Sequence, residues 1–418
     1  MNSTQKHQSS PPVQDMRKAN PDARQGLKPV RRLSGMPERQ MPKIVRYKGP
    51  MDRVFLILVL ILICFGSVMV FSASYAYSMS RYNGNGYVYI SKQLINVLIG
   101  LGFMFGIAKL VDPYTLRKNV GKLYFVTIIL LALVLLIGTI GGGAKRWIMI
   151  AGFSVQPSEI AKATLVFMLA AHFEKHSERI ISPKSTKESL KYGLLWPLMY
   201  TGILCLLVVL EKHLSGTIII FLIGIAVMWA GGTDAKFILI PGLVCGSLLT
   251  VLALLIPYTK RRIDIWLNPT NDLTGDGWQT IQGLNAIGSG GLLGLGPTNS
   301  RQKHMYVSQP QNDFIYSILC EELGFIGAVT VIVLFVMLIV RGYHIAKHAP
   351  DTFSSLVVIG IVSKIGLQAA FNIGVVTNLI PNTGISLPFF SYGGSSTIVL
   401  LAEMGVVLSI SRFSRQDR

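Results

Sequence analysis

The hydrophobic positions of this 418-residue chain fall into long apolar runs separated by shorter polar stretches. The first run, Val54 to Ala73, is long enough to cross about 30 Å of hydrocarbon as a helix. Nine further runs of spanning length follow at 94–111, 123–140, 158–173, 193–210, 214–231, 237–257, 314–340, 354–376 and 393–410. Because the bilayer interior offers no water to backbone polar groups, the pattern predicts an all-α polytopic membrane protein with ten transmembrane helices.

The composition excludes an ordinary cytosolic enzyme. The chain is 51% hydrophobic and 14% charged, whereas about a quarter of the residues of a soluble domain are charged. The cysteines are scattered within or at the ends of apolar stretches, without C-x-x-C spacing, at Cys64, Cys205, Cys245 and Cys320. They predict neither a disulfide framework nor a metal framework.

The distribution of charge predicts the orientation in the membrane. The formal net charge is +19. Residues 1–53 are basic and contain no apolar run, so we expect a disordered basic cytoplasmic tail, followed by 54–73 as an uncleaved signal anchor. An even number of helices puts both termini on one side, and 26 of the 39 Lys and Arg residues fall on that side against 10 opposite. The termini, including 411–418, are therefore predicted to be cytoplasmic, and the tract 258–313, between the seventh and eighth helices, extracytoplasmic.

The long tract 258–313 carries no nucleotide signature. Its stretch 288–296 is rich in glycine but does not match G-x-G-x-x-G, and no Walker A motif occurs in the chain. We predict no nucleic-acid partner either. The glycines and aromatic residues of the tract favour folded re-entrant or interfacial segments over a structureless loop.

Positive charge gathers at two places on the predicted outer side, where it is disfavoured. Lys145 and Arg146 stand beside Trp147, and the long tract holds Lys260, Arg261, Arg262, Arg301 and Lys303. A phosphate-bearing substrate would explain such clusters. Binding to the headgroups of membrane lipids is the alternative explanation.

Polar residues also lie inside the predicted helices. The fourth helix opens with Gln156, Ser158 and Glu159, and Lys162 follows Glu159 on the same face. Ionisable groups within a membrane pair with one another or line a polar cavity, so substrate contact and a structural ion pair are both open. A polar stripe at Lys364, Gln368 and Asn372 on the ninth helix is explained equally well by hydrogen bonding between helices.

Asp313 is the sharpest catalytic candidate. It stands where the long tract enters the eighth helix. Partial burial at the membrane boundary would raise its pKa toward the range of a general base, and nearby cations would oppose that shift. An aspartate at this place could instead serve only as a helix cap.

Seven motifs in one order resemble the SEDS family of shape, elongation, division and sporulation proteins, which includes FtsW, RodA and SpoVE. The motifs are Gly143-Ala-Lys-Arg-Trp-Ile148, Gln156-Pro-Ser-Glu159 with Lys162, Gly288-Ser-Gly-Gly291, Ser300-Arg-Gln-Lys303, Asn312-Asp-Phe-Ile315, Glu321-Glu-Leu-Gly324 and Pro388-Phe-Phe-Ser-Tyr-Gly-Gly-Ser-Ser396. The resemblance spans about residues 54–410, the expected membrane domain. The segment 294–303 is closer to the FtsW and SpoVE branch than to RodA.

The resemblance implies an enzyme that polymerises lipid II into peptidoglycan glycan strands at the outer face of the cytoplasmic membrane. The essential aspartate of the family matches Asp313, its loop tryptophan Trp147, and its intramembrane Glu and Lys match Glu159 and Lys162. Ser391 and Ser395, in the last motif, are then further substrate-binding candidates. The resemblance also implies a class B penicillin-binding protein and other division proteins as partners.

The implied reaction inverts the donor sugar and releases undecaprenyl pyrophosphate. The leaving group requires positive charge from Lys145, Arg146 and the cations of the long tract, with or without a divalent cation such as Mg²⁺ or Mn²⁺. The sequence shows no protein-only cage for such a metal, which would have to be held partly by the pyrophosphate.

Two departures from the family pattern stand out. Val307-Ser308-Gln309 replaces a common Leu-Pro-Glu run, and Lys212-His213 falls where the family often has Pro-Asp, which leaves Glu211 as the nearby acid. Two other functions remain open at this point. A lipid II flippase would also use intramembrane charges, and a non-catalytic division scaffold would act mainly through its basic tail.

Overall fold

The computed structural model describes residues 49–141, 144–150, 153–181, 183, 185–239, 242–243, 246–247, 257–272 and 275–413. All of them belong to one compact unit, Tyr47–Arg418. The predicted basic tail lies almost wholly outside the described residues, as does most of the predicted seventh run, 237–257.

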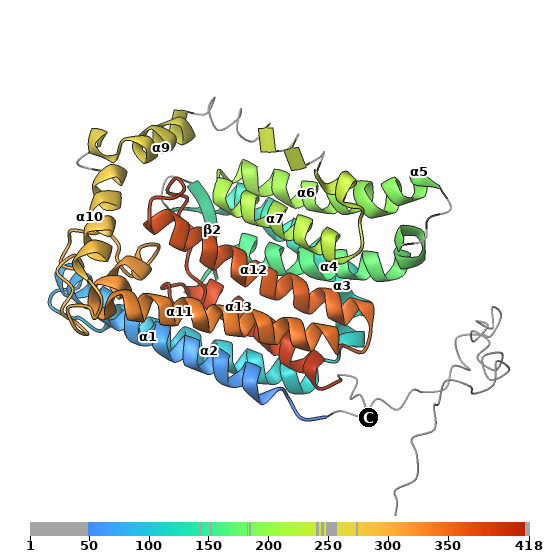
Figure 1. The fold of residues 1–418 in the computed structure, drawn as a ribbon, viewed down its shortest axis with the longest axis horizontal. Helices are drawn as coiled ribbons and strands as arrows, with labels where there is room; N and C mark the ends of the chain where they lie inside the picture. Colours follow the sequence, from blue (N-terminus) through green and yellow to red (C-terminus); the bar gives the residue numbers. More distant parts are fainter. Residues whose placement is uncertain are drawn as a thin grey trace, which may run out of the picture. The chain divides into compact units, whose positions relative to one another are not determined.

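Helices make up most of the described chain (Figure 1). Nine of the ten predicted runs coincide with helices. One of them, 193–210, begins in a π-helical turn, η4 (Leu190–Leu195), and continues through α6. The helices of these runs are α1 (Arg53–Arg81), α2 (Val88–Leu110), α3 (Pro113–Ile137), α4 (Pro157–Ile181), α6 (Trp196–Leu210), α7 (Leu214–Ala230), α11 (Ile315–Lys347), α12 (Thr352–Val376) and α13 (Gly394–Ser411). A short helix, α5 (Thr186–Ser189), precedes η4.

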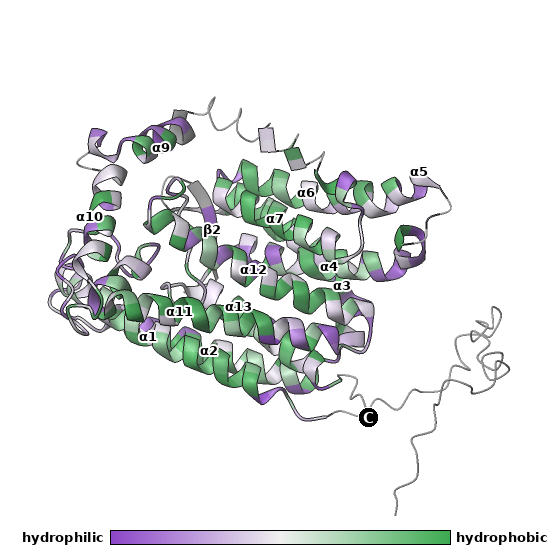
Figure 2. Cartoon of the chain, in the orientation of Figure 1, coloured by the Kyte–Doolittle hydropathy of each residue, from purple (hydrophilic) through white to green (hydrophobic). Residues whose placement is uncertain are grey.

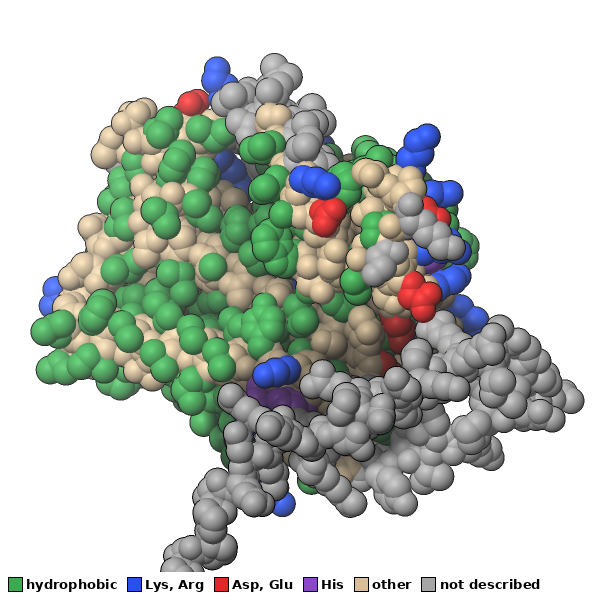
Figure 3. All heavy atoms as spheres, turned by 45° about the vertical axis from the view of Figure 1, so that its right-hand side comes forward, with side chains coloured by type: hydrophobic (Ala, Val, Ile, Leu, Met, Phe, Trp, Pro, Cys, Tyr) green, Lys and Arg blue, Asp and Glu red, His purple; other side chains and the backbone are tan. Residues whose placement is uncertain are grey.

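Seven helical segments in the described part are long and apolar enough to cross a membrane. They are α1, α2, α3, the continuous segment Thr186–Leu210, α11, α12 and α13, and α7 is a shorter apolar helix. Hydrophobic residues run along these helices in Figure 2. Figure 3 shows hydrophobic side chains over much of one flank, with most charged side chains near its margins.

Helix α12 lies at the centre of the packing and contacts α11, α4, α7 and α13. Around it, α2 packs against α13, α3 against α4, and α6 against α7. Fully buried apolar side chains join these contacts into one core, among them Phe55, Leu165, Phe353 and Phe390. Helices distant in sequence thus meet around α12, which carries the polar stripe.

The prediction of an all-α chain is wrong in one region. Three short strands form an antiparallel sheet in which β2 (Ala144–Ile150) lies between β1 (Thr139–Gly141) and β3 (Phe153–Val155). Branched and aromatic residues of β2 suit a pleated strand. The strands are short, and this tract was expected to be a loop because no apolar run of spanning length crosses it.

The tract 258–313 is folded, as expected from its glycines and aromatic residues. It contains α9 (Pro257–Leu267), a 3-10 turn η5 (Pro269–Asn271) and α10 (Asp276–Ser289), which packs against α11. In Figure 1, α9 and α10 lie at the end of the bundle near β2, whereas α5 lies at the opposite end.

Helix α11 is broken at Gly324, whose φ of 66° and ψ of −166° are not helical. The glycine-rich loop enters this break, because Leu295 N–H donates to the carbonyl of Glu321 at 2.9 Å and Gly296 N–H to that of Glu322 at 3.0 Å. A Cβ on Gly324 would lie 2.3 Å from the nitrogen of Gly294. The glycines therefore allow two backbones to approach closely, and the first turns of α11 form a separate segment that begins beside Asp313.

Candidate active site around Asp313

Three backbone anchors hold the residues that lead to Asp313. Asn372 of α12 donates from its amide nitrogen to the carbonyl of Asp313 at 2.8 Å. The hydroxyl of Ser391 donates to the carbonyl of Asn312 at 2.9 Å, and Tyr392 N–H donates to that of Gln311 at 2.8 Å. The chain before α11 is thus fixed to α12 and to the connection between α12 and α13.

The Asp313 carboxyl group is half-buried and sits among cations. Burial raises its pKa to about 6, although Arg262 and Arg146 act in the opposite direction. A Cβ on Gly384 would lie 3.4 Å from its Oδ2, so the connection after α12 passes close to the carboxylate. At neutral pH a carboxylate with this pKa is ionised yet basic enough to accept a proton, as a general base requires.

Two neighbouring arginines of α9 have different environments. Arg262 is half-buried, donates from Nη1 to the carbonyl of Asn382 at 3.0 Å and acts on Asp313. Arg261, chosen from the sequence as a substrate contact, is exposed and pairs with Asp272 at 3.1 Å. The structure therefore places Arg262, and not Arg261, in the electrostatic environment of Asp313.

Strand β2 supplies the second cation near Asp313. Arg146 is half-buried and donates from Nη2 to the carbonyl of Lys212 at 2.6 Å. Trp147, the next residue, is also half-buried, and its carbonyl accepts a hydrogen bond from Thr139 at 3.1 Å. Lys145 pairs with Ile140 in the sheet, and its side chain lies outside the described part of the chain.

Two predicted cations of the long tract are placed differently. Lys303 is 4% exposed, and its ammonium donates to Glu322 at 2.9 Å, to Ser72 at 3.2 Å and to the carbonyl of Thr298 at 2.5 Å. An ammonium has three protons to donate, so these partners use all of them. The structure thus gives Lys303 an internal ion pair, and the phosphate contact stays a prediction. Arg301 is exposed.

Glu321 and Glu322 hold the loop that contains Lys303. The carboxylate of Glu321 accepts hydrogen bonds from the hydroxyl of Ser300, from Arg301 N–H at 2.9 Å and from Gln302 N–H at 3.3 Å. The motifs at 300–303 and 321–324, recognised separately in the sequence, are therefore two halves of one contact.

The start of α4 lies in a buried polar region. Ser158 is fully buried and its hydroxyl lies 3.3 Å from Nδ1 of His213, while Gln156 N–H donates to the hydroxyl of Ser395 at 3.0 Å. Glu159 and Lys162 are both buried and form an ion pair at 2.6 Å. The structural ion pair that the sequence left open is present, and a role in substrate contact stays a prediction.

A second buried ion pair joins α12 and α13 next to the first. Lys364 donates to Glu403, and both side chains are almost fully buried. Each pair exerts an electrostatic effect on the other. Helices α4, α12 and α13 therefore share four alternating charges, which a low-dielectric interior tolerates only when they are paired.

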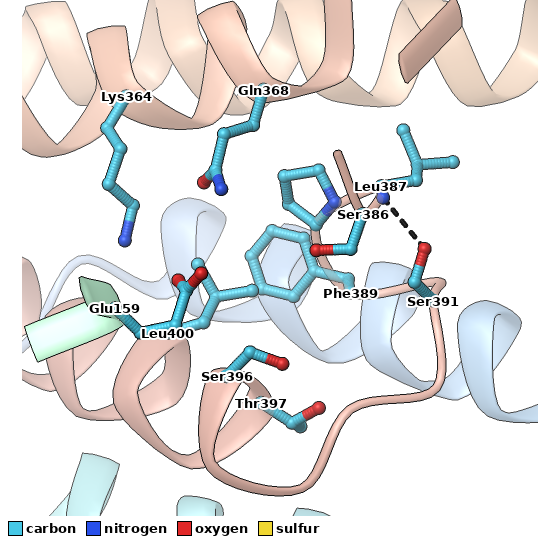
Figure 4. Close-up of a pocket in the computed structure, with 11 residues that line it drawn as sticks. Glu159, Lys364, Gln368, Ser386, Leu387, Phe389, Ser391, Ser396, Thr397 and Leu400 are labelled. Atoms are coloured by element: carbon cyan, nitrogen blue, oxygen red, sulfur yellow. Dashed lines mark hydrogen bonds between the residues drawn. The ribbon is translucent and has the colours of Figure 1, made fainter. Parts of the chain in front are cut away.

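A small cavity opens beside this charge cluster. Glu159, Lys364 and Gln368 border it from α4 and α12, with Ser396 and Thr397 from α13 (Figure 4). Ser391 also lines it, although its hydroxyl already donates to Asn312 and accepts from Leu387 N–H at 2.7 Å. The polar stripe of α12 thus runs from this cavity to the Asp313 peptide.

Three residues of this region were not among the site residues predicted from the sequence. Asn372 and Arg262 were noted only within a stripe and a charge cluster, and Glu211 only as the acid left by a departure from the family pattern. Among the described residues no group of three or more His, Cys, Asp or Glu residues could hold a metal ion. A divalent cation at the site stays a prediction.

A family model described as "Cell cycle protein", which covers FtsW, RodA and SpoVE, matches residues 52–416. The chain belongs to this family. "Stage V sporulation protein E" of Bacillus subtilis is 39% identical over 87% of this chain and 98% of that protein. A "Probable peptidoglycan glycosyltransferase FtsW" of Geobacter sulfurreducens is 36% identical over 86% of this chain and 95% of its own.

Solved structures agree with the family assignment. One chain, from "Structural coordination of polymerization and crosslinking by a peptidoglycan synthase complex", superposes with a TM-score of 0.71 at 29% identity and covers 88% of this chain and 99% of its own. The rod shape determining protein RodA of Thermus thermophilus superposes with a TM-score of 0.64 at 27% identity. The superposition covers 90% of this chain and 100% of the RodA chain. Like its FtsW and RodA relatives, the chain is a multi-pass protein of the cytoplasmic membrane.

Proposed function

We propose that this protein is a peptidoglycan glycosyltransferase that polymerises lipid II at the outer face of the cytoplasmic membrane, in cell division or sporulation. The observation that carries the proposal is the environment of Asp313, a carboxylate with a pKa near 6 that is held by its backbone and faced by Arg262 and Arg146. The names of the FtsW and SpoVE relatives support it.

In the proposed reaction Asp313 accepts the proton of the acceptor GlcNAc 4-hydroxyl. The oxygen attacks the anomeric carbon of the donor MurNAc, the bond to the pyrophosphate breaks, and the configuration inverts. Arg146 and Arg262 then lie where negative charge develops on departing undecaprenyl pyrophosphate, which is the usual role of cations in such sites. A divalent cation would add the same kind of stabilisation, held largely by the pyrophosphate itself.

The proposed topology has ten transmembrane helices with both termini in the cytoplasm. It places the sheet, α9, α10 and Asp313 together on the outer side. In Figure 1, α9 and α10 lie at one end of the bundle, near β2. A class B penicillin-binding protein is the proposed partner, since polymerisation and crosslinking are coordinated in the synthase complex whose chain this protein resembles.

Lipid II transport is less well supported. A flippase needs polar lining through both leaflets. The stripe of α12 reaches from Asn372 to Lys364, a depth of about 12 Å at 1.5 Å per residue. Between Lys364 and Ser355 the helix carries only one polar residue, Ser363.

The decisive assay uses the full chain in complex with its penicillin-binding protein partner and purified lipid II. Wild type should form glycan polymer, and Asp313→Ala should not. Polymerisation by Asp313→Ala would remove the general base. Translocation of labelled lipid II into sealed vesicles that survives in Asp313→Ala, without polymer, would favour the flippase.

A further inference from the structure

Glu211 is a buried carboxyl group that the proposed mechanism does not use. It follows α6 directly and is 2% exposed. Neither carboxyl oxygen has a hydrogen-bond partner among the described residues. An ionised carboxylate in such a place is costly, so the group is stable only when it keeps its proton or faces a compensating charge.

The compensating charge beside Glu211 is Arg146. The Arg146 guanidinium binds the carbonyl of Lys212, the residue next to Glu211, and it lowers the pKa of both Glu211 and Asp313. One guanidinium therefore acts on two carboxyl groups. Asp313 is the proposed base, and the proton on Glu211 decides how much of the Arg146 charge is left uncancelled.

The other ionisable groups around Glu211 come from α7 and α4. His213, at the start of α7, stays neutral because burial, Arg146 and Lys162 lower its pKa to about 3. Glu159 and Lys162 of α4 pair with each other. Lys212 is exposed, and α3 carries no ionisable residue between Phe125 and Ile137.

We propose that Glu211 is a positioning residue that sets the charge available at Arg146: the ionised form of Glu211 offsets the guanidinium charge that acts on an anionic leaving group, and the protonated form does not. This inference rests on the proposed function. It also gives a physical role to the segment where the chain departs from the Pro-Asp pattern of its family.

The proposal predicts a window of activity with two different limits. Burial raises the pKa of Glu211 to about 8, against about 6 for Asp313. Below pH 6 Asp313 is protonated and cannot act as a base. Above pH 8 Glu211 loses its proton, and the positive charge facing the leaving group falls. Activity should therefore be highest between these values.

The test is the pH dependence of polymerisation by the complex with its penicillin-binding protein, for wild type, Glu211→Gln and Glu188→Gln. Glutamine has the shape of the protonated acid and cannot ionise. Glu188 is a matched control because it lies on α5, at the opposite end of the continuous helical segment from Glu211.

Wild type and Glu188→Gln should lose about tenfold in kcat between pH 7 and pH 9, as expected one unit above a single ionisation. Glu211→Gln should be active at pH 7, and its kcat should fall by less than about twofold between pH 7 and pH 9. An alkaline loss unchanged in Glu211→Gln would overturn the proposal, and so would a folded Glu211→Gln that is inactive at pH 7.

An infrared titration tests the proton on Glu211 without any activity. The pH 7 minus pH 9.5 difference spectrum of wild type and Glu188→Gln should contain the C=O band of a protonated carboxyl group, which Glu211→Gln should lack. A wild-type spectrum without that band would overturn the inference even if Glu211→Gln failed to fold. Wild type that makes no polymer, with the band present, would contradict the proposed function while the protonation of Glu211 stands.

Discussion

Asn372 of α12 binds the carbonyl of Asp313 at 2.8 Å, across 59 residues of sequence. The same amide nitrogen donates to the carbonyl of Ile385 at 2.7 Å. One side chain therefore joins the start of α11 to the connection that passes the Asp313 carboxylate. Its position on α12, which packs against α11, α4, α7 and α13, makes the placement of Asp313 a property of the core and not of a loop.

Replacing Asn372 with alanine should lower both stability and activity. The change leaves two carbonyls without their donor, and a buried polar group that loses its partner costs about 1–3 kcal/mol. Thermal unfolding in detergent should shift downward, and kcat should fall by at least about tenfold because a base displaced by even 1 Å loses about that much or more.

Ser363→Ala is the matched control for this change. Ser363 lies on the same helix, and its hydroxyl contacts Tyr343 at an exposed position. Its loss should leave kcat and the unfolding temperature almost unchanged. Equal effects of the two variants would mean that the hydrogen bond to Asp313 has no special role.

The acid limit of activity should move when Arg262 is removed. Arg262 lowers the pKa of Asp313, so Arg262→Gln should raise that pKa and shift the acid limb of the kcat/KM profile to higher pH. Arg261→Gln, one residue away and paired with Asp272, should leave the limb in place. The measurement is the rate of polymerisation between pH 5 and 8 for wild type, Arg262→Gln and Arg261→Gln. A shift of the acid limb in Arg261→Gln alone would contradict the assignment of Arg262 to the environment of Asp313.

The two arginines of α9 show what sequence reasoning can and cannot distinguish. The apolar runs identified nine described helices, because hydrophobic patterning is a local signal. The motif around Asp313 is also a local signal, and the role of its carboxylate stays a prediction. The choice between Arg261 and Arg262 depends on how α9 is rotated toward the connection after α12, which contains Asn382. That rotation is set by tertiary contacts, so spacing along the chain could not distinguish the two.

The partners of Lys303 could not be read from the sequence either. A lysine in a predicted outer loop was expected to meet phosphate, but its partner Glu322 lies on α11 and is equally buried. Two adjacent acids at the start of a helix gave no sign that one of them binds the loop. The strands at 139–155 were missed because the sheet is small and forms part of a polar tract.

Lys303→Met should therefore act mainly on stability. Removing one partner of a buried pair leaves an uncompensated charge on Glu322 and costs about 3–5 kcal/mol. Arg301→Gln, which changes an exposed side chain two residues away, should leave the unfolding temperature within about 1 °C, since surface changes are usually within about 0.5 kcal/mol. A Lys303→Met protein of normal stability with a raised KM for lipid II would restore the substrate role predicted from the sequence.

The ion pair between Lys364 and Glu403 should show strong coupling. Lys364→Met and Glu403→Leu should each destabilise by about 3–5 kcal/mol, because each leaves a charge buried without its partner. The double variant should recover much of that loss, so a double-mutant cycle of unfolding free energies should give a large interaction energy. Additive losses would mean that the two side chains do not depend on each other.

The break in α11 provides the last prediction, because it separates the turns next to Asp313 from the rest of the helix. Gly324→Ala would place a methyl group 2.3 Å from the nitrogen of Gly294, in a backbone conformation that costs other residues about 1–3 kcal/mol. The loop at 291–296 must then move, and with it Lys303 and the start of α11.

Gly106→Ala is the control, since a Cβ there meets nothing within 4 Å. This change should leave the unfolding temperature unchanged or raise it slightly, because alanine favours an open helix position more than glycine does. Gly324→Ala should unfold at lower temperature and lose kcat more than KM. A variant as stable and active as Gly106→Ala would show that the close contact at the break can relax without cost.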